Sequence, residues 1–225
     1  MVDKNHNLST NDVIKCTKCE RLIKYRAFIE QHKKYDQEYW SRPIPGYGDI
    51  NGRLLIIGLA PAAHGGNRTG RIFTGDKSSD FLVSSLYQAG ITNQPLSKSI
   101  DDGLIYIDSY ITLALKCAPP ENKPLNSELK NCSAFLFDEI RSMRSLKAVL
   151  VLGKIAFDSY INYLKKLNVN TKNVKFKNFV YYDINNVRLY CSYHPSPRNV
   201  NTGLLKKDDF IEFLKSIKFY INENV

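Results

Sequence analysis

Short apolar runs alternate along this chain with longer segments in which apolar residues recur every three or four positions. Three runs have the length and apolar content of buried strands: residues 53–57, 106–116 and 147–152. Four segments have the spacing of amphipathic helices: residues 78–89, 129–143, 154–167 and 210–217. Two further strand-like runs, 176–182 and 187–193, flank Asn185 and Asn186, a pair suited to a tight hairpin turn. This alternation predicts an α/β fold with a mostly parallel sheet and helices on both of its faces.

The N-terminal segment is rich in basic side chains. Ser9 and Thr10 can cap a helix that we expect to run toward Lys34, with a basic face turned to solvent or to phosphate. Two prolines and two glycines interrupt residues 40–48. We therefore expect an irregular loop there, leading into the strand at 53–57.

Composition limits the classes of protein that this chain fits. With 225 residues, 43% of them hydrophobic, it suits one globular domain over residues 1–225. Lys and Arg outnumber Asp and Glu by 32 to 22, and the net charge of +10 fits either a polyanionic partner such as nucleic acid or an inert basic surface. Residues 1–7 are polar and lack the apolar segment of a secretory signal, and the longest apolar run, 54–63, is too short to span a bilayer. We therefore expect a cytoplasmic, nucleoid-associated protein with no membrane partner.

The loop that follows the strand at 53–57 carries the most chemistry. Residues 58–76 include five glycines, which permit close backbone approach, and the aromatic ring of Phe73. The loop also contains four charged or hydrogen-bonding side chains: His64, Arg68, Arg71 and Asp76. Open α/β proteins bind their ligands at the carboxyl ends of parallel strands, so this loop is the first candidate for a site.

A second loop, residues 192–199, also comes straight after a predicted strand. Its prolines hold the backbone rigid, so that His194 and Ser196 can project from the edge of the sheet. A histidine in this position can donate a hydrogen bond to an oxygen that gains negative charge as a bond breaks. A single histidine is more often a packed or solvated residue. The rigid frame and the nearby hydroxyl favour the functional interpretation here.

Four of the five cysteines fall into two groups. Cys16 and Cys19 form a Cys-x-x-Cys pair, and Cys117 and Cys132 lie further along the chain. In a reducing cytosol, four such thiolates around one metal centre are favoured over two disulfides, and both zinc and an iron-sulfur cluster accept four cysteines. Alternatively, Cys132 is a buried apolar residue of its helix. Cys191 lies in a predicted strand, so we interpret it as a core residue.

Several motifs, taken in order, resemble the uracil-DNA glycosylase superfamily, specifically its B-type or family 5 branch. They occupy residues 58–65, 73–76, 116–124 and 194–197. The resemblance implies a three-layer α/β/α fold around a central, mostly parallel four-stranded sheet. It also implies a structural [4Fe-4S] cluster held by Cys16, Cys19, Cys117 and Cys132. The activity it implies is that of a monofunctional DNA repair glycosylase, which flips uracil out of DNA and hydrolyses the N-glycosidic bond to leave an abasic site.

The same resemblance implies roles for individual residues. Asp76, His194 and Asn122 are the expected catalytic residues: a carboxylate near the sugar, a donor to the departing base, and a group that positions water or base. Phe73 is expected to stack on the flipped base. The other expected substrate-binding residues are Gly58, Ala60, Ala62, His64, Ser196 and Arg198. Structural alternatives exist for three of these: Asp76 as a helix N-terminal acid, Asn122 as a turn residue and Phe73 as a core aromatic.

Departures from the wider superfamily point to a roomy pocket. Ala60 stands where the best-known uracil enzymes carry a water-activating Asp, so we expect Asp76 to take over that role. Ala62 replaces a Tyr that blocks the methyl group of thymine, and Leu113 replaces a uracil-reading Asn of a sister branch. We therefore expect hypoxanthine and xanthine to be accepted beside uracil. Arg198 stands where many relatives have a Leu wedge, and it could fill the gap or contact phosphate.

The expected partner is double- or single-stranded DNA that contains deaminated bases. We expect a monomer, with a sliding clamp as a candidate protein partner. The alternative function is a metal-stabilised nucleic-acid-binding module that has lost catalysis, which Ala60 in place of the usual acid suggests.

Overall fold

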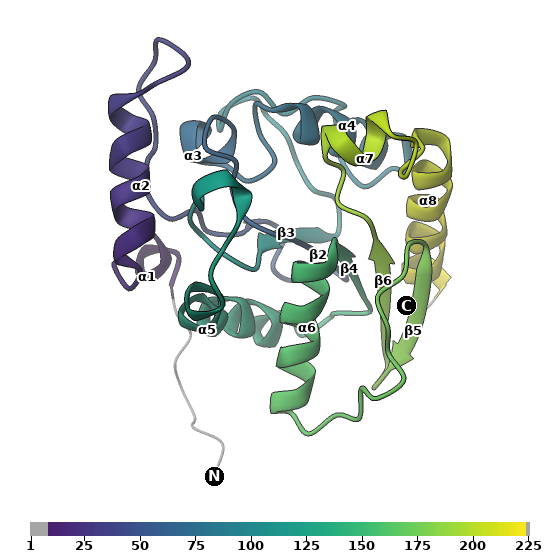
Figure 1. The fold of residues 1–225 in the computed structure, drawn as a ribbon. Coiled ribbons are helices and arrows are strands. Elements are labelled where there is room, and N and C mark those ends of the chain that lie inside the picture. The colour runs from purple at the N-terminus through teal and green to yellow at the C-terminus, as the bar shows by residue number, and fades with distance from the viewer. Residues whose placement is uncertain (1–8, 224–225) are drawn as a thin grey trace.

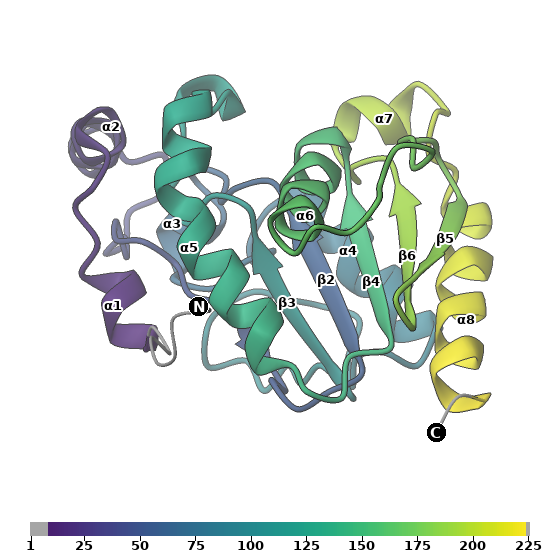
Figure 2. The same cartoon turned by 90° about the horizontal axis from the view of Figure 1, so that it is seen from below.

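A computed structural model describes residues 9–223, and the polar start at residues 1–7 lies outside this range. Four parallel strands form the centre of the sheet: β3 (Ser109–Leu113), β2 (Leu54–Gly58), β4 (Ala148–Leu152) and β6 (Val187–Ser192). Two antiparallel strands, β1 (Tyr47–Gly48) and β5 (Val180–Ile184), extend its edges, giving the order β1-β3-β2-β4-β6-β5. Figure 2 shows β3, β2, β4, β6 and β5 side by side in this order. The predicted parallel four-stranded core is confirmed, and the sheet has six strands.

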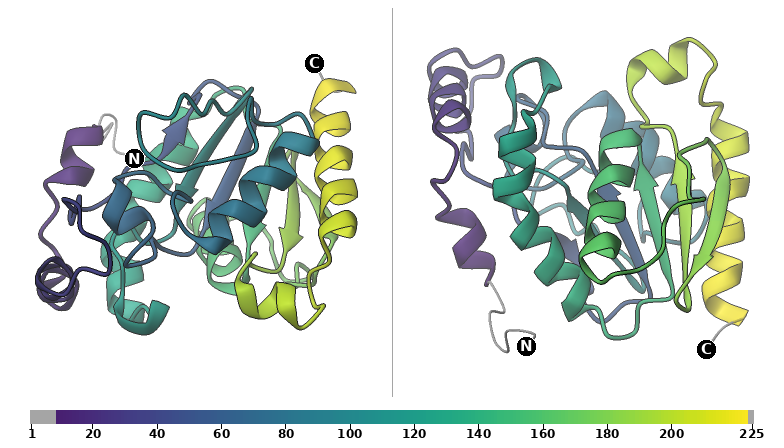
Figure 3. Two further views of the ribbon diagram at one scale, coloured as in Figure 1. Left: turned by 90° about the horizontal axis from the view of Figure 1, so that it is seen from above. Right: turned by 60° about the horizontal axis from the view of Figure 1, so that its bottom comes forward.

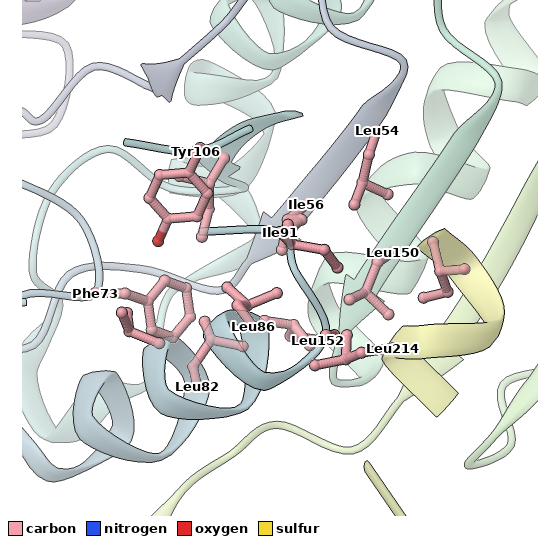
Figure 4. Packing of buried hydrophobic residues seen from close by; sticks show 14 of the residues in the cluster. Leu54, Ile56, Phe73, Leu82, Leu86, Ile91, Tyr106, Leu150, Leu152 and Leu214 are labelled. Carbon is pink, nitrogen blue, oxygen red and sulfur yellow. The ribbon is translucent and has the colours of Figure 1, made fainter. Parts of the chain in front are cut away.

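Helices cover both faces of this sheet. Side chains alternate along a strand, so Leu54 and Ile56 pack on one face while Leu55 and Ile57 pack on the other. The first face is covered by α4 (Lys77–Gln88) and α8 (Lys207–Glu223), which contact each other (Figure 3, left). Figure 4 shows Leu82 and Leu86 of α4 and Leu214 of α8 in this cluster. The second face is covered by α5 (Asn126–Ser142) and α6 (Lys154–Lys166). Burial on both faces explains why β2 and β4 are continuous apolar runs.

The N-terminal segment differs from its prediction. Ser9 caps a helix in a reciprocal capping box with Asp12, as expected, but that helix, α1 (Thr10–Ile14), ends after five residues. A second helix, α2 (Glu20–Gln31), begins after an extended Cys19. The single helix predicted from Ser9 toward Lys34 is therefore wrong. Between the two helices, Cys16 and Cys19 line a cavity together with Cys117 and Cys132.

The short elements lie at the ends of the strands. The hairpin prediction is confirmed: Asn185 and Asn186 join β5 to β6 with positive φ angles of 48° and 64°. Three short helical elements lie in the segments after the parallel strands. They are α3 (Gly66–Thr69) after β2, the 3-10 helix η1 (Pro120–Asn122) after β3 and α7 (Pro197–Asn201) after β6. Figure 1 shows α3, α4 and α7 along one edge of the molecule. Within residues 9–223, none of the helices combines the length and apolarity that a membrane crossing requires.

Candidate active site

The two loops singled out in the sequence emerge from the same edge of the sheet. Strands β2 and β6 each pair in parallel with β4, which lies between them. They end at Gly58 and Ser192, on the same edge of the sheet. The loops meet through the rings of Phe73 and His194, whose centroids are 5.9 Å apart with an interplanar angle of 28°. Residues 121 positions apart in the sequence are therefore neighbours at this edge.

Phe73 belongs both to the core and to this edge. Only 9% of its surface is exposed, and its backbone has a positive φ of 46°. A Cβ atom added to Gly58 would lie 2.8 Å from the Phe73 ring and 2.8 Å from Leu113 Cδ2. Glycine at position 58 therefore lets Phe73 and Leu113 close over the end of β2. The core interpretation of Phe73 is confirmed, and its ring is also placed against His194.

Asp76 is the N-cap of α4. Its Oδ1 accepts a hydrogen bond from the Ser79 amide at 2.9 Å, and Ser79 Oγ accepts one from the Asp76 amide at 3.0 Å. Its Oδ2 lies only 2.0 Å from the position that a Cβ on Gly65 would take, so glycine at 65 makes room for this carboxylate. Burial raises the pKa of Asp76, while the amides of Ser79 and Ser78 and the charge of Arg68 oppose the rise. The helix-cap interpretation is thus confirmed, on the same loop that carries Phe73.

His194 is held by its own loop. The Asn199 side-chain amide donates to the His194 carbonyl at 2.8 Å, and Ser196 caps α7 by accepting from the Asn199 amide at 3.3 Å. Gly153, at the end of β4, leaves room beside His194: a Cβ at position 153 would be 3.3 Å from the His194 Cβ. Burial lowers the pKa of His194 to about 4. The imidazole is therefore neutral at neutral pH, with one N–H to donate.

This burial predicts a pH effect on stability. The unfolded imidazole takes up a proton near its ordinary pKa of 6.5, whereas the folded one does so only near 4. The unfolded state therefore binds more protons between these values, and the folded protein should lose up to about 3 kcal/mol of unfolding free energy as pH falls through this window. Denaturant titrations at pH 7 and pH 4.5 measure the loss, and a His194→Gln variant should show a smaller one. Equal losses in the two proteins would contradict a His194 imidazole that the fold keeps neutral.

Two arginines of the loop after β2, residues 58–76 and called the first loop below, make structural hydrogen bonds. Arg71 is 2% exposed, and its guanidinium donates to Thr74, Ser97 and Asp102. Arg68 donates from Nε to the His64 carbonyl at 2.7 Å and from Nη2 to the Gly75 carbonyl at 2.8 Å, which closes the loop on itself. These side chains give residues 64–76 a defined shape.

The remaining predicted site residues lie on segments that follow β2, β3 and β6. Ala62 is half-buried, and its carbonyl accepts from the amides of Gly65 and Asn67. Ala60 packs against the cysteine cluster described below. Asn122 is exposed at the end of η1, after β3, with a positive φ of 57°, so its interpretation as a turn residue is confirmed. Arg198 is exposed in α7.

Four cysteines line one cavity beside α2. Its walls include Cys16, Cys19, Cys117 and Cys132, with an apolar floor of Leu22, Leu115 and Phe135. All five cysteines are free thiols, and Cys191 is fully buried in β6, so its core interpretation is confirmed. Cys132 is also buried, at 7% exposure, but it shares the cavity with the other three.

Polar hydrogens point at three of these sulfur atoms. Arg26 Nη1 donates to Cys117 Sγ at 3.3 Å, the Lys116 amide to Cys132 Sγ at 3.3 Å, and Asn131 Nδ2 to Cys19 Sγ at 3.7 Å. Such donors stabilise thiolates. Across residues 9–223, no group of three or more His, Cys, Asp or Glu side chains converges on a single ion position. The four cysteines therefore share one lining, and both zinc and an iron-sulfur cluster accept four cysteine ligands.

Sequence reasoning missed two residues that hold the loops. Tyr39 is 4% exposed, and its hydroxyl lies 3.0 Å from His64 Nδ1. No motif marks Tyr39, which precedes its partner by 25 residues. Asn199 lies in the second loop, but only the folded structure shows its side chain bound to the His194 carbonyl.

Comparison with known proteins agrees with these features. The sequence model of the uracil DNA glycosylase superfamily matches residues 45–218. Two relatives are named type-5 uracil-DNA glycosylase. The one from Pyrobaculum aerophilum is 45% identical over 206 residues, which cover 91% of this chain and 88% of that protein. The one from Thermus thermophilus is 37% identical over 206 residues, 90% of this chain and 92% of that protein.

A type-4 uracil-DNA glycosylase from Saccharolobus solfataricus is more distant, at 26% identity over 92% of this chain and 83% of that protein. The match to the superfamily covers both loops at the sheet edge, and the type-5 relatives span nearly the whole chain. The chain therefore belongs to the uracil DNA glycosylase superfamily, in its type-5 branch.

Proposed function

We propose that this protein is a DNA repair glycosylase that extrudes uracil from DNA and hydrolyses its N-glycosidic bond. The main observation in support of this proposal is the contact between Phe73 and His194, which joins two loops at the carboxyl edge of the sheet. The net charge of +10 favours binding to the DNA backbone. The names of the type-5 relatives support the same activity.

The proposed reaction breaks the bond between C1′ of deoxyribose and the base nitrogen. The bonding electrons leave with the base, and water adds to C1′ as hydroxide while its proton is released, so that an abasic site and a free base result. Charge develops as an anion on the base and a cation on the sugar, and the site must match both. Neutral His194 would donate its N–H to the base oxygen that gains negative charge. Ionised Asp76 would stabilise the sugar cation or orient the water.

Other residues would shape the pocket. Phe73 would stack on the extruded base, and Asn122 would help to position the water or the base. Leu113 and Ala62 carry no polar group that reads uracil, so hypoxanthine and xanthine are proposed as further substrates. The remaining proposed contacts to DNA come from Gly58, Ala60, His64, Ser196 and Arg198. The working unit is proposed to be a single domain over residues 1–225, acting in the cytoplasm as a monomer.

The test is an excision assay on oligonucleotides that contain one lesion. Duplex and single-stranded DNA with uracil, hypoxanthine or xanthine is incubated with the protein and then treated with alkali, which cuts at abasic sites. Strand scission at uracil is expected. Binding without scission at any lesion, across a range of salt concentrations, would instead support the non-catalytic binding module.

We further propose that Cys16, Cys19, Cys117 and Cys132 hold a structural [4Fe-4S] cluster. The shared cavity and the N–H donors to three sulfur atoms support this assignment. When bound, the cluster supplies a covalent link between the start of α2, the loop after β3 and α5. The chain's own contribution is the apolar floor, which shields the sulfur atoms from water.

This assignment predicts the colour and metal content of the protein. Anaerobically purified protein should be brown, with iron and acid-labile sulfide in equal amounts. Cys117→Ser should lose most of this iron, because one of four ligands is gone. Cys191→Ala is the matched control, since Cys191 lies outside the cavity, and it should keep its iron. A colourless protein that contains zinc would contradict the cluster.

A further inference from the structure

The Tyr39 hydroxyl makes three hydrogen-bonding contacts. It accepts from the backbone amides of Lys34 at 3.1 Å and Tyr35 at 3.3 Å, and it lies 3.0 Å from His64 Nδ1. The Tyr39 and His64 rings meet edge to face, with centroids 5.9 Å apart. Tyr39 lies in the segment between α2 and β1, whereas His64 lies on the loop that carries Phe73 and Asp76.

Counting hydrogens determines the direction of the third contact. A phenol oxygen carries one hydrogen and accepts up to two hydrogen bonds. Two backbone amides fill its acceptor positions, so its hydrogen remains for His64 Nδ1. That nitrogen must then be an acceptor, and the proton of the neutral imidazole sits on Nε2. The pKa of His64 is lowered by burial and by the nearby charges of Lys34 and Arg68, which favours this neutral form.

The surroundings of His64 are positively charged. Arg68 donates to the carbonyls of His64 and Gly75 and to the Gln37 side-chain oxygen, and it lies over the Tyr35 ring at 4.6 Å. All of these hydrogen-bond and ring partners are neutral. Within residues 9–223 no carboxylate forms an ion pair with Arg68, although its charge also acts on the Asp76 carboxylate and opposes the rise in the pKa of Asp76. Lys34 likewise lies over the Tyr35 ring, at 5.5 Å. An oriented N–H donor beside two cations, neither of which forms an ion pair within residues 9–223, suits an anionic oxygen.

We propose that Tyr39 is a positioning residue that holds His64 as its Nε2–H tautomer, and that His64 then binds a phosphate of the DNA backbone. The identity of the ligand rests on the proposed function, whereas the tautomer does not. This contact would fix the position of the DNA backbone relative to the first loop. A nucleotide extruded nearby would then reach Phe73 and His194. It carries no sequence information, because phosphates are the same at every base.

The tautomer is tested by nitrogen NMR on the free protein. The chain has four histidines, His6, His32, His64 and His194, so ring nitrogens labelled with nitrogen-15 can be assigned with single variants. His64 is expected to show a protonated Nε2 and an unprotonated Nδ1 at pH 7. Tyr39→Phe should abolish this preference and give a mixture of tautomers. A protonated Nδ1 in the wild type would overturn the proposal.

The control variant is Tyr182→Phe. The Tyr182 hydroxyl also accepts a backbone amide, that of Lys175 at 3.3 Å, and donates to the Lys175 carbonyl, but it lies on β5 away from the first loop. Its loss should leave the His64 signals unchanged. A change equal to that in Tyr39→Phe would mean that general loosening of the fold, and not the Tyr39 hydroxyl, alters His64, which would overturn the positioning role.

The phosphate contact is tested by DNA binding without turnover. His64→Ala should weaken binding to undamaged duplex and to abasic product duplex by the same factor, about tenfold, as expected for a lost hydrogen bond to a charged group. Tyr39→Phe should weaken both in the same way by a smaller factor. In excision assays, both variants should raise KM and leave kcat within about twofold of the wild type.

Each result has a distinct meaning. A loss of affinity confined to one of the two duplexes, or a fall in kcat with unchanged KM, would overturn the phosphate contact. A wild-type protein that excises no uracil would overturn the proposed function, while the NMR and binding results would still decide the roles of Tyr39 and His64.

Discussion

Asp76→Asn is expected to lower kcat for uracil excision by roughly 10²–10⁴-fold, the usual contribution of a positioned acid-base or electrostatic group. The variant separates the two roles of this residue. Asparagine is a good N-cap, and its side-chain oxygen can still accept the Ser79 amide that Asp76 Oδ1 accepts at 2.9 Å. It lacks the negative charge that the proposed mechanism assigns to Asp76. Single-turnover excision assays and denaturant unfolding of the same preparation measure both effects.

Two further variants sharpen this experiment. Asp76→Ala removes the cap as well as the charge and should cost about 1 kcal/mol of additional stability. Asp80→Asn is the matched control, because Asp80 is an exposed acid in the first turn of the same helix, and it should retain activity. Burial raises the pKa of Asp76, so wild-type activity should increase with pH through that raised value and then level off. If Asp76→Asn keeps the kcat of the wild type, Asp76 is a helix cap alone.

Asp102→Asn should destabilise the fold by about 3–5 kcal/mol, because it leaves the Arg71 guanidinium buried without its charge partner. The Arg71 side chain is 1% exposed, and its Nη2 lies 2.7 Å from Asp102 Oδ2. Arginine does not lose its proton to relieve the cost. Arg71 anchors the first loop to residues 97–102, so excision should also become more sensitive to temperature. Denaturant unfolding at pH 7 measures the change in free energy.

A surface pair provides the control for this prediction. Asp183 forms two hydrogen bonds with Arg188, but its side chain is 60% exposed. Asp183→Asn should therefore cost no more than about 1 kcal/mol. Similar losses of unfolding free energy in Asp102→Asn and Asp183→Asn would contradict this prediction. They would show that the burial of Arg71 does not make its ion pair with Asp102 more important for stability than an exposed pair.

The pattern of apolar residues predicted most of the fold because burial acts on each strand or helix separately. Leu54 to Ile57 are all fully buried, as a strand covered on both faces must be, and Phe210, Leu214 and Ile217 form the buried stripe of α8. The same reasoning failed between Ser9 and Lys34. The helix is interrupted between Ile14 and Glu20, where Cys16 and Cys19 line a cavity together with cysteines about 100 positions away, and such a long-range contact has no local signal.

The candidate site was predictable where it depends on loops that follow strands. Phe73 contacts His194 directly at the predicted edge, and Asp76 follows Phe73 on the same loop as the N-cap of α4. Roles within the loops were not predictable. Arg68 and Arg71 looked like ligand-binding groups in the sequence, yet one closes the loop and the other is buried beneath it. Tyr39 carried no signal, because its partner lies on a different segment.

The sequence by itself determined the α/β class, the parallel core, the edge of the sheet that carries the candidate site and the group of cysteines. These properties follow from local periodicity, from the direction of parallel strands and from residue types that only a few kinds of site use. Tertiary structure alone decided which charges are buried, which nitrogen of His64 lies within hydrogen-bond distance of Tyr39 and how Gly58 and Gly65 make room for Phe73 and Asp76. Those outcomes depend on contacts between distant segments, where a shift of one ångström decides whether a group is solvated, paired or excluded.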